Sequence, residues 1–252
     1  MISVITCARN PASQTIQERN VAKTAGTRHE YLLYDNSSGE YNLASVYGYA
    51  VSQAKGDILV YIHDDVFFMK PGWGDVIERK FAADPSLGCI GVAGTQYLFA
   101  DNASLTAAGR PFIKGRIIHD LQNGDFFAVV FSQENGDFEV VACDGFFMAV
   151  RKDLFGQVQF DCTTFDRNSF YDLDLCMQIR QTHRIMITTE IVLKKRTNMV
   201  YDKSWQECGK LFLEKWAGHL PAACTGEVPN PVNRPSTQIV NLKGKVPQEI
   251  IT

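Results

Sequence analysis

The sequence predicts an α/β protein in which a mixed, mostly parallel sheet is flanked by helices. Strand-like apolar runs alternate with helix-like segments through the first hundred residues, and clusters of turn residues separate them. The 252 residues, 45% of them hydrophobic, are enough to bury a full core as one large domain. We therefore expect a single domain over residues 1–224, with halves at 1–100 and 101–224, followed by a tail over 225–252.

The first half shows the strand–helix–strand order that places parallel strands side by side. Its expected strands are residues 2–7, 30–34, 58–62 and 88–93. Its expected helices are residues 13–25, 42–54 and 73–83. Turn residues support these boundaries, because 35–39 reads Asp-Asn-Ser-Ser-Gly and 55–57 reads Lys-Gly-Asp. This half is therefore expected to form the parallel part of the sheet.

The second half has a different character. Two apolar, β-rich runs at 126–131 and 138–143 flank a turn-like segment at 133–137, which predicts a β-hairpin. The later expected elements are a strand at 146–150, a short helix from about 151, a helix at 171–182, a strand at 184–188 and a helix at 203–216. The tail has no aromatic residue and contains four prolines, so we expect it to be irregular, packed along the surface or mobile.

Composition gives no electrostatic reason to expect a nucleic-acid partner. The formal net charge is −3, whereas nucleic-acid binding usually requires a basic face or stripe. The short basic run Lys194-Lys195-Arg196 is more typical of a solvated strand end, with a phosphate contact as the alternative. No nucleic-acid partner is therefore expected.

The seven cysteines indicate a reducing compartment. They are odd in number, scattered and without a Cys-x-x-Cys pair, and several lie in apolar runs as reduced core cysteines do. A strand that begins at Ile2 leaves no room for a signal peptide, so we expect a cytoplasmic protein. No apolar run approaches the ~18 residues of a membrane helix, so any membrane association is expected to be peripheral.

The apolar strand at 58–62 ends in His63, Asp64 and Asp65. Ligands of open α/β sheets bind beyond the carboxyl ends of the strands, where carboxylates and an imidazole are suited to hold a divalent metal against a phosphate. The alternative is that the two aspartates only solubilise the strand exit, because loops are generally polar. From these residues alone both interpretations stay open.

A second acidic cluster opens the helix that is expected from residue 171. Helical spacing places Asp172 on the face of Cys176 and Ile179, toward the packed side of the helix. It places Asp174 on the polar face of Gln178, toward solvent. Asp172 is therefore the candidate for a carboxylate that faces the sheet. The alternative is a first-turn acid that caps the helix and interacts with its dipole.

Two further acids follow expected strands. Asp144-Gly145 interrupts two apolar runs, so its carboxylate either faces a cleft or belongs to an ordinary turn. Asp35 has the same two interpretations, because the residues after it form an equally good turn. The sequence contains no Gly-x-Ser-x-Gly, no glycine-rich phosphate loop and no His-Glu-x-x-His motif, which excludes serine hydrolase, P-loop and zincin chemistry.

Together, the order and spacing of these motifs over about residues 2–216 resemble nucleotide-sugar glycosyltransferases with the Rossmann-like GT-A fold, in the broad family-2 group of inverting enzymes. The segments that carry the resemblance are 3–10, 34–38, 54–57, 63–66, 144–152, 171–176 and 205–216. The resemblance implies a nucleotide-sugar half at 1–100 and an acceptor half, with the hairpin, at 101–224. The residues that it implies for nucleotide-sugar contacts are Cys7, Arg9, Asp35, Asn36, Lys55, Asp64, Asp144 and Gly145.

The resemblance also implies roles for the two acidic clusters. His63-Asp64-Asp65 stands at the family's Asp-x-Asp motif, so Asp65 and His63 are the expected ligands of a divalent metal, Mn²⁺ or Mg²⁺. His63 replaces the first acid of that motif. Tyr171-Asp172 stands at the family's Glu-Asp motif, so Asp172 is the expected general base, with Tyr171 in place of the glutamate.

The function implied by the resemblance is hexosyl transfer from a nucleotide-sugar donor, a UDP-sugar first among them. The acceptor is a hydroxyl of a glycan, a lipid-linked molecule or a protein. One alternative is a catalytically inactive module of the same fold that binds a nucleotide or sugar as a scaffold or regulator, and His63 and Tyr171 favour it. A nucleotidyltransferase is a weaker alternative, because residues 8–11 are not a glycine-rich triphosphate loop.

Overall fold

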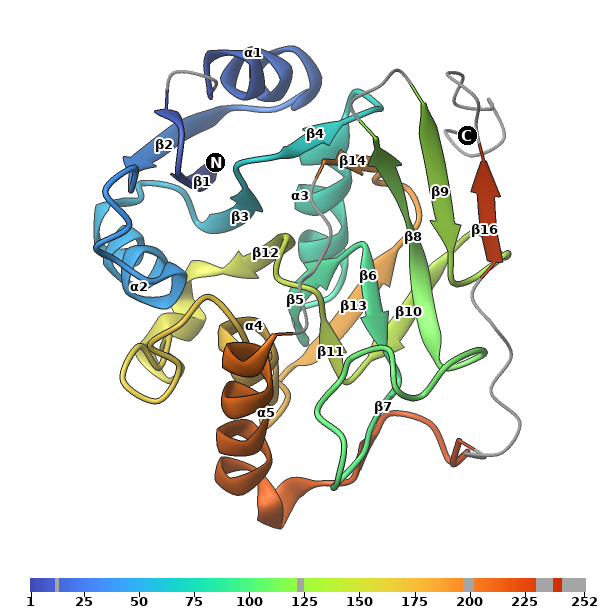
Figure 1. Ribbon diagram of the computed structural model, residues 1–252. Helices are drawn as coiled ribbons and strands as arrows, with labels where there is room; N and C mark the ends of the chain where they lie inside the picture. Colours follow the sequence, from blue (N-terminus) through green and yellow to red (C-terminus); the bar gives the residue numbers. More distant parts are fainter. Residues whose placement is uncertain (12–13, 122–124, 197–201, 230–237, 242–252) are drawn as a thin grey trace.

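The computed structural model describes residues 1–11, 14–121, 125–196, 202–229 and 238–241 (Figure 1). Within these residues a seven-stranded mixed sheet forms the centre of the molecule. In spatial order its strands are β10 (Asp137–Val140), β13 (Arg184–Thr188), β5 (Leu87–Gly91), β12 (Phe147–Arg151), β3 (Ile58–His63), β1 (Ile2–Ala8) and β2 (His29–Asp35). Only β10 and β12 run opposite to the others. The predicted α/β class is confirmed.

The central strand β3 is buried on both of its faces. Successive side chains of a strand point to opposite faces of the sheet. Leu59 and Tyr61 therefore pack into one apolar cluster, while Val60 and Ile62 pack into another, and all four are fully buried. A continuous apolar run, as opposed to an alternating one, is what a strand covered on both faces requires.

Helices cover both faces of this sheet (Figure 1). The cluster of Leu59 and Tyr61 includes residues of α2 (Leu43–Gln53), α4 (Tyr171–Ile179), α5 (Lys203–Lys215) and the 3-10 turn η2 (Lys152–Gly156). The opposite cluster includes residues of α1 (Gln14–Thr24) and α3 (Trp73–Ala83). A short 3-10 turn, η3 (Ala217–His219), follows α5. Asn42 begins α2, because its side-chain oxygen accepts a hydrogen bond from the backbone N–H of Ser45 at 2.8 Å.

A second layer of strands lies beside the central sheet (Figure 1). Its main path contains, in spatial order, β11 (Ala142–Cys143), β6 (Ala93–Thr95), β8 (Ile113–Asp120), β14 (Leu193–Lys195) and β4 (Val66–Phe68). Two further strands extend it from β8, namely β9 (Phe126–Val130) and β16 (Gln238–Asn241). A small separate pair consists of β7 (Tyr97–Leu98) and β15 (Ala222–Ala223).

The hairpin of the second half is built from strands other than the predicted ones. β9 pairs antiparallel with β8, with Val129 opposite Ile117. β10 instead joins the edge of the central sheet beside β13. The predicted pairing of 126–131 with 138–143 is therefore wrong, because the turn-like residues 133–137 lead from one sheet to the other.

Part of the expected irregular tail is a strand. β16 pairs antiparallel with β9, with Val240 opposite Ala128. The expectation of an irregular tail over 225–252 is therefore wrong at these residues, because an otherwise open strand edge offers backbone hydrogen-bond partners to a short extended segment. Residues 230–237 and 242–252 of that prediction lie outside the described part of the chain.

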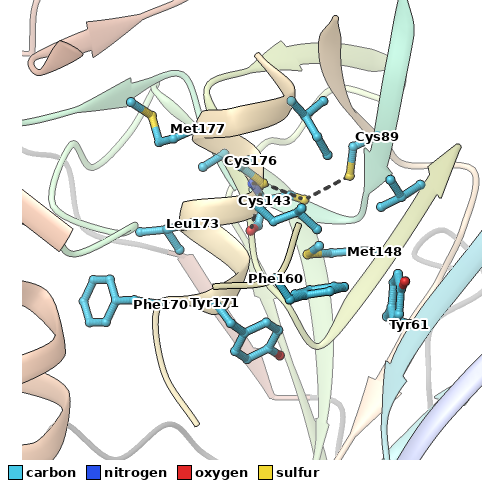
Figure 2. Close-up of a cluster of buried hydrophobic side chains, with 14 of the residues drawn as sticks. Tyr61, Cys89, Cys143, Met148, Phe160, Phe170, Tyr171, Leu173, Cys176 and Met177 are labelled. Carbon is cyan, nitrogen blue, oxygen red and sulfur yellow. Dashed lines mark hydrogen bonds between the residues drawn. The ribbon is translucent and has the colours of Figure 1, made fainter. Parts of the chain in front are cut away.

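Three of the cysteines meet in the core between the central sheet and α4 (Figure 2). The Sγ atom of Cys143 lies 3.7 Å from that of Cys89 and 3.7 Å from that of Cys176. All three are fully buried, and all seven cysteines of the chain are free thiols. They behave as small core side chains.

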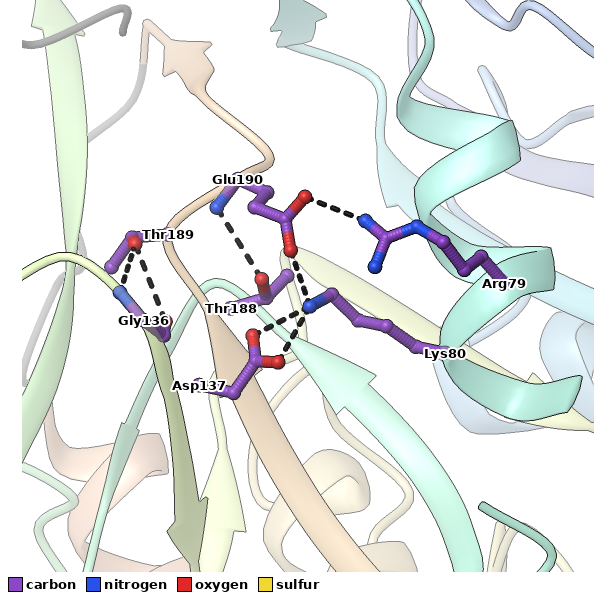
Figure 3. A network of polar contacts seen from close by, with 7 residues as sticks. All are labelled: Arg79, Lys80, Gly136, Asp137, Thr188, Thr189 and Glu190. Carbon is purple, nitrogen blue, oxygen red and sulfur yellow. Dashed lines mark hydrogen bonds and ion pairs between the residues drawn. The ribbon is translucent and has the colours of Figure 1, made fainter. Parts of the chain in front are cut away.

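Lys80 on α3 is a buried lysine with two carboxylate partners (Figure 3). Its Nζ atom lies 2.6 Å from Asp137 Oδ2 and 2.5 Å from Glu190 Oε1, and its side chain is 5% exposed. Arg79 contacts the same Glu190 carboxylate from the surface at 2.6 Å. This network ties α3 to the start of β10 and to the residues that follow β13. None of the described helices has both the length and the apolar composition that crossing a bilayer requires.

Candidate active site

A cavity of about 640 Å³ lies at the carboxyl ends of β1 and β3, between the two layers of strands and the start of α4. This is the edge at which open α/β sheets bind their ligands. The predicted site residues that line it are Cys7, Arg9, Asn36, His63, Asp64, Asp144 and Asp172. The structure therefore brings together residues from both halves of the chain.

The remaining predicted site residues lie outside the cavity wall. Asp35 is the exposed last residue of β2, and its Oδ1 accepts a hydrogen bond from the backbone N–H of Ser37 at 2.9 Å. Asp65 and Gly145 are sequence neighbours of lining residues. Lys55 is exposed and precedes β3, so it lies at the opposite end of that strand from the cavity. The structure does not bring this residue to the cavity wall, and its role in the nucleotide-sugar site stays a prediction.

The turn between β3 and β4 is fixed by two side chains from the first half of the chain. The Gln17 amide donates to the backbone carbonyls of His63 and Val66, both at 2.7 Å. The Asp64 carboxylate accepts from the backbone N–H of Arg9 at 3.1 Å and from its guanidinium at 3.4 Å. These contacts hold the end of β3 against the loop after β1, so both loops meet at the cavity.

His63 and Tyr171 contact each other inside the site. His63 Nε2 lies 2.8 Å from the Tyr171 hydroxyl, and that hydroxyl donates to the carbonyl of Gly145 at 3.2 Å. Which of the two groups donates in the His63–Tyr171 hydrogen bond depends on the tautomer of the imidazole. Burial, followed by the nearby charge of Lys195, lowers the pKa of His63. The neutral form of the imidazole is therefore favoured.

Gly145 and Asp172 form the closest contact between the β11–β12 turn and α4. The Gly145 backbone N–H donates to Asp172 Oδ2 at 2.7 Å. A Cβ atom on Gly145 would lie 2.6 Å from the Tyr171 hydroxyl and 2.7 Å from Asp172 Cβ, so only glycine allows this approach. Asp172 is therefore oriented by the sheet as well as by its own helix.

The environment of Asp172 makes it a weak acid. Its side chain is buried at the cavity, with the residue 8% exposed, and the start of α4 has no side-chain cap. Burial, followed by the negative charge of Asp144, raises the pKa of Asp172 to about 7, although the Gly145 hydrogen bond opposes this rise. Asp172 is not the N-cap of α4, which is Phe170, but it does lie in the first turn of that helix. A carboxyl group with such a pKa is suited to accept and release a proton at neutral pH.

Asp174 is not in solvent, and the prediction of an exposed side chain is wrong. The residue is fully buried. Its Oδ1 accepts from the Trp216 indole at 2.8 Å and lies 2.8 Å from Lys215 Nζ, while its Oδ2 accepts from Gln178 at 2.8 Å. The face of α4 that looks polar in the sequence is covered by the end of α5.

Several lining residues were not among the predicted site residues. Lys195 and His119 come from neighbouring strands of the second layer, and Phe170 and Trp205 form an aromatic part of the wall. Burial, followed by the charge of Lys195, lowers the pKa of His119 to about 4. Only Lys195 had a signal in the sequence, namely the basic run at 194–196. The other three residues belong to segments that the fold, and not their local sequence, brings to the cavity.

The predicted metal ligands do not form a metal centre in this arrangement. Within the described ranges no three His, Cys, Asp or Glu side chains are grouped so that they would hold a metal ion. Nε2 of His63 is directed at Tyr171, and Asp65 Oδ2 accepts from the backbone N–H of Arg196 at 3.2 Å. The carboxylate of Asp64 contacts Arg9. Nε2 of His63, one oxygen of Asp65 and the Asp64 carboxylate therefore have protein partners in this structure.

A mixed α/β sheet with a polar cavity at its carboxyl edge is typical of the class of α/β proteins that bind ligands beyond the ends of their strands. Within that class, the chain belongs to the glycosyltransferase-like family, whose sequence pattern matches residues 3–216. The predicted family is confirmed. A search of the curated proteins finds no match.

Two solved structures share the fold. A crystal structure of GalNAc-T7 with UDP, GalNAc and Mn²⁺ aligns with a TM-score of 0.56 and 10% identity, over 81% of this chain and 45% of that chain. The mannosyltransferase PcManGT from Pyrobaculum calidifontis, in complex with GDP-Man and Mn²⁺, aligns with a TM-score of 0.52 and 13% identity, over 91% of this chain and 66% of that chain. Both are glycosyltransferases, which confirms the GT-A-type fold. The chain spans between about half and two thirds of their lengths.

Proposed function

We propose that the protein transfers a sugar from a nucleoside-diphosphate-sugar to an acceptor hydroxyl, with Asp172 as the general base. The observation that carries the proposal is a buried carboxyl group at the cavity whose pKa is raised to about 7. Membership of the glycosyltransferase-like family supports it. The two structures that share the fold contain UDP with GalNAc and GDP-Man, which supports a nucleotide-sugar donor.

The chemistry requires a base because a hydroxyl is a weak nucleophile. As the acceptor oxygen forms its bond to the anomeric carbon, its proton passes to the Asp172 carboxylate. The bond between the anomeric carbon and the diphosphate oxygen breaks, and the diphosphate leaves with the electron pair. Displacement from the side opposite to the leaving group inverts the anomeric carbon. The Gly145 N–H keeps Asp172 in place during this step.

The donor occupies the part of the cavity that the loops after β1, β2 and β3 surround. Asn36 holds its own loop closed, since its amide donates to the Tyr41 carbonyl at 2.6 Å and accepts from the Tyr41 N–H at 3.1 Å. In this proposal Cys7, Arg9 and Asn36 contact the nucleoside, with Asp35 at the rim. The donor sugar lies toward Asp144 and Gly145, next to the base.

A divalent cation, Mn²⁺ or Mg²⁺, with Asp65 and His63 as ligands stays a prediction. The test is a calorimetric titration of the purified protein with Mn²⁺ at a fixed concentration of UDP. If Asp65 is a ligand, Asp65→Asn abolishes the Mn²⁺-dependent part of UDP binding and leaves the metal-free part unchanged. Equal Mn²⁺ dependence in the variant and the wild type would show that Asp65 is not a ligand.

The experiment that tests the function is a donor screen. Purified protein is incubated with UDP-, GDP- and TDP-linked hexoses, and release of the nucleoside diphosphate is followed with and without glycan acceptors. We expect release with at least one donor, faster when the correct acceptor is present. A protein that binds a nucleoside diphosphate but neither transfers nor hydrolyses any donor would instead be a binding module.

The inactive binding module is the second candidate function, and one observation favours it. The two residues that replace acids in the family's motifs, His63 and Tyr171, bond to each other inside the cavity. The donor screen separates the two candidates directly. The acceptor class, peripheral membrane association and the cytoplasmic location stay predictions, as does the division of the domain at residues 100 and 224.

A further inference from the structure

Lys195 is a buried lysine whose ammonium group has no ionic partner in the described part of the chain. It is the last residue of β14 and is 8% exposed. β14 lies between two strands, so that Lys195 is opposite Val66 of β4 and opposite His119 of β8. Its Nζ lies 4.9 Å from the centre of the Phe146 ring, and no described carboxylate lies within 4 Å of it. The residue lines the cavity.

Two other lysines, one buried and one partly buried, show how the chain normally treats such a group. Lys80 is held by two carboxylates at 2.5–2.6 Å. Lys194, the neighbour of Lys195 on the same strand, lies 2.8 Å from Asp120. Removing an ammonium from water is unfavourable unless an anion compensates for the lost hydration. The unpaired ammonium of Lys195 therefore points to an anion that the cavity receives from outside.

The position of Lys195 in the cavity specifies which anion fits. Val66, opposite Lys195, directly follows the turn of Asp64 and Asp65, at the carboxyl end of β3. Asp144 lies in the same wall, next to the turn that holds the proposed base Asp172. In a nucleotide-sugar the diphosphate joins the nucleoside to the sugar, and in the proposed function both occupy this cavity, so the anion that reaches Lys195 is the diphosphate.

We propose that Lys195 binds the diphosphate of the donor and stabilises the negative charge that develops on it as the bond to the sugar breaks. The ammonium donates hydrogen bonds to phosphate oxygens, and the cavity thereby binds a nucleoside diphosphate without a divalent ion. This inference rests on the proposed function, because it assigns the cation of the same site. The competing interpretation is a structural lysine that only packs on Phe146.

The test is calorimetric binding of UDP and GDP to the full chain in the presence of EDTA. Lys195→Met keeps the apolar stem and removes the charge, so we expect diphosphate binding to weaken about tenfold or more, because one charge-assisted hydrogen bond contributes at least that much. Lys195→Arg keeps the charge and should stay within about threefold of the wild type. Lys194→Met removes the neighbouring charge from the opposite face of the strand and serves as the matched control, with no weakening expected.

Two further probes keep the result decisive. The nucleosides uridine and guanosine lack the diphosphate, so their binding should be the same in Lys195→Met and the wild type. Thermal unfolding of every variant checks folding, and Lys195→Gln replaces Lys195→Met if the latter does not fold. The proposal is overturned if Lys195→Met binds UDP and GDP as tightly as the wild type, or if the wild type binds them only after Mn²⁺ is added.

Inorganic pyrophosphate separates failure of this inference from failure of the proposed function. If the wild type binds neither UDP nor GDP but binds pyrophosphate in a Lys195-dependent manner, the nucleotide-sugar function fails and the anion site at Lys195 stands. If neither the nucleotides nor pyrophosphate bind, with or without Mn²⁺, both proposals fall. If Lys195→Met binds the nucleotides as tightly as the wild type does, the proposed function stands and only the role of Lys195 is excluded.

Discussion

His63 Nε2 is hydrogen-bonded to the Tyr171 hydroxyl at 2.8 Å, although the two residues are 108 positions apart in the chain. The same hydroxyl donates to the Gly145 carbonyl. One tyrosine oxygen therefore joins the end of β3, the β11–β12 turn and the first residue of α4. These are the three segments that meet at Asp172.

Tyr171→Phe is expected to destabilise the fold. It leaves the Nε2 atom of His63 and the Gly145 carbonyl without this partner, which should lower the free energy of unfolding by about 1–3 kcal/mol. Urea unfolding measures the change. Tyr49→Phe is the control, because the Tyr49 side chain is largely exposed and the same substitution there should change stability by less than about 0.5 kcal/mol. Equal losses in the two variants would show that the buried hydroxyl contributes nothing specific.

Asp172→Asn is expected to abolish most turnover while donor binding is kept. General-base catalysis contributes about 10²- to 10⁴-fold, and an asparagine oxygen still accepts the Gly145 hydrogen bond without accepting a proton from the acceptor. Steady-state transfer rates and calorimetric UDP binding give the two quantities. A variant that transfers sugar at the wild-type rate would exclude Asp172 as the base.

The pH dependence of the rate follows from the raised pKa of Asp172. The base must be ionised, so kcat/KM should fall as the pH drops through about 7, with a tenfold loss for each unit below it. The profile is recorded between pH 5 and pH 9. A profile that is flat between pH 5 and pH 7 would contradict the assignment.

Stability should depend on pH in the opposite sense. The pKa of Asp172 is about 7 in the folded protein and about 3.9 in an unfolded chain, so between these values the folded state binds more protons. The contribution of this carboxyl to stability is therefore complete below about pH 4 and is lost as the pH rises through about 7. Asp172→Asn lacks this loss, so its stability relative to wild type should improve by up to about 4 kcal/mol from pH 4 to pH 8. Urea unfolding at the two pH values measures it, and a constant difference would contradict the raised pKa.

Gly145→Ala is expected to disrupt the site through one methyl group. The added Cβ would lie 2.6 Å from the Tyr171 hydroxyl and 2.7 Å from Asp172 Cβ, and overpacking of this kind costs about 1–3 kcal/mol. Displacement of Asp172 should also lower the transfer rate. Gly156→Ala is the matched control, because a Cβ there meets nothing within 4 Å, and both stability and rate should be preserved. Thermal unfolding and activity assays decide, and a silent Gly145→Ala would mean that the turn and α4 are not in contact.

Lys80→Met is expected to destabilise the protein without affecting the site. It leaves Asp137 and Glu190 beside each other without their shared cation (Figure 3). Both carboxylates are partly exposed, so the loss should be about 1–3 kcal/mol, below that of a fully buried pair. Arg79→Met removes an exposed partner of the same Glu190 and should cost less than about 1 kcal/mol. Urea unfolding compares the two, and a larger loss for Arg79→Met would contradict the central role of Lys80.

Local signals in the sequence were sufficient for the helices and the central-sheet strands of the first half, but not for its short strands β4, β6 and β7. The run at 58–62 is apolar throughout, and β3 lies close to where it is predicted. Asn42 is a typical first residue of a helix, and α2 begins directly after it, as predicted. The inward direction of Asp172 also follows from helical spacing within a single element. Each of these features depends on residues that are near one another in the chain.

The features that were mispredicted depend on segments that are distant in the chain. Asp174 is buried because Trp216 and Lys215, about forty residues later, cover its face of α4. The strand β10 pairs with β13 and not with its sequence neighbour β9, and the turn residues between β9 and β10 do not determine this pairing. Lys195 reaches the cavity because β14 inserts between β4 and β8. A helical wheel or a turn pattern contains none of this information.

The three tryptophans of the chain are distributed in a way that makes ligand binding visible by fluorescence. Trp205 lines the cavity, and Trp216 donates its indole N–H to Asp174, two residues after the proposed base. The third, Trp73, stacks on Phe68 with ring centres 4.1 Å apart, on the other side of the central sheet. The protein therefore carries one unlabelled optical reporter at its cavity, a second that is hydrogen-bonded to the helix of the proposed base, and an internal reference on the other side of the sheet.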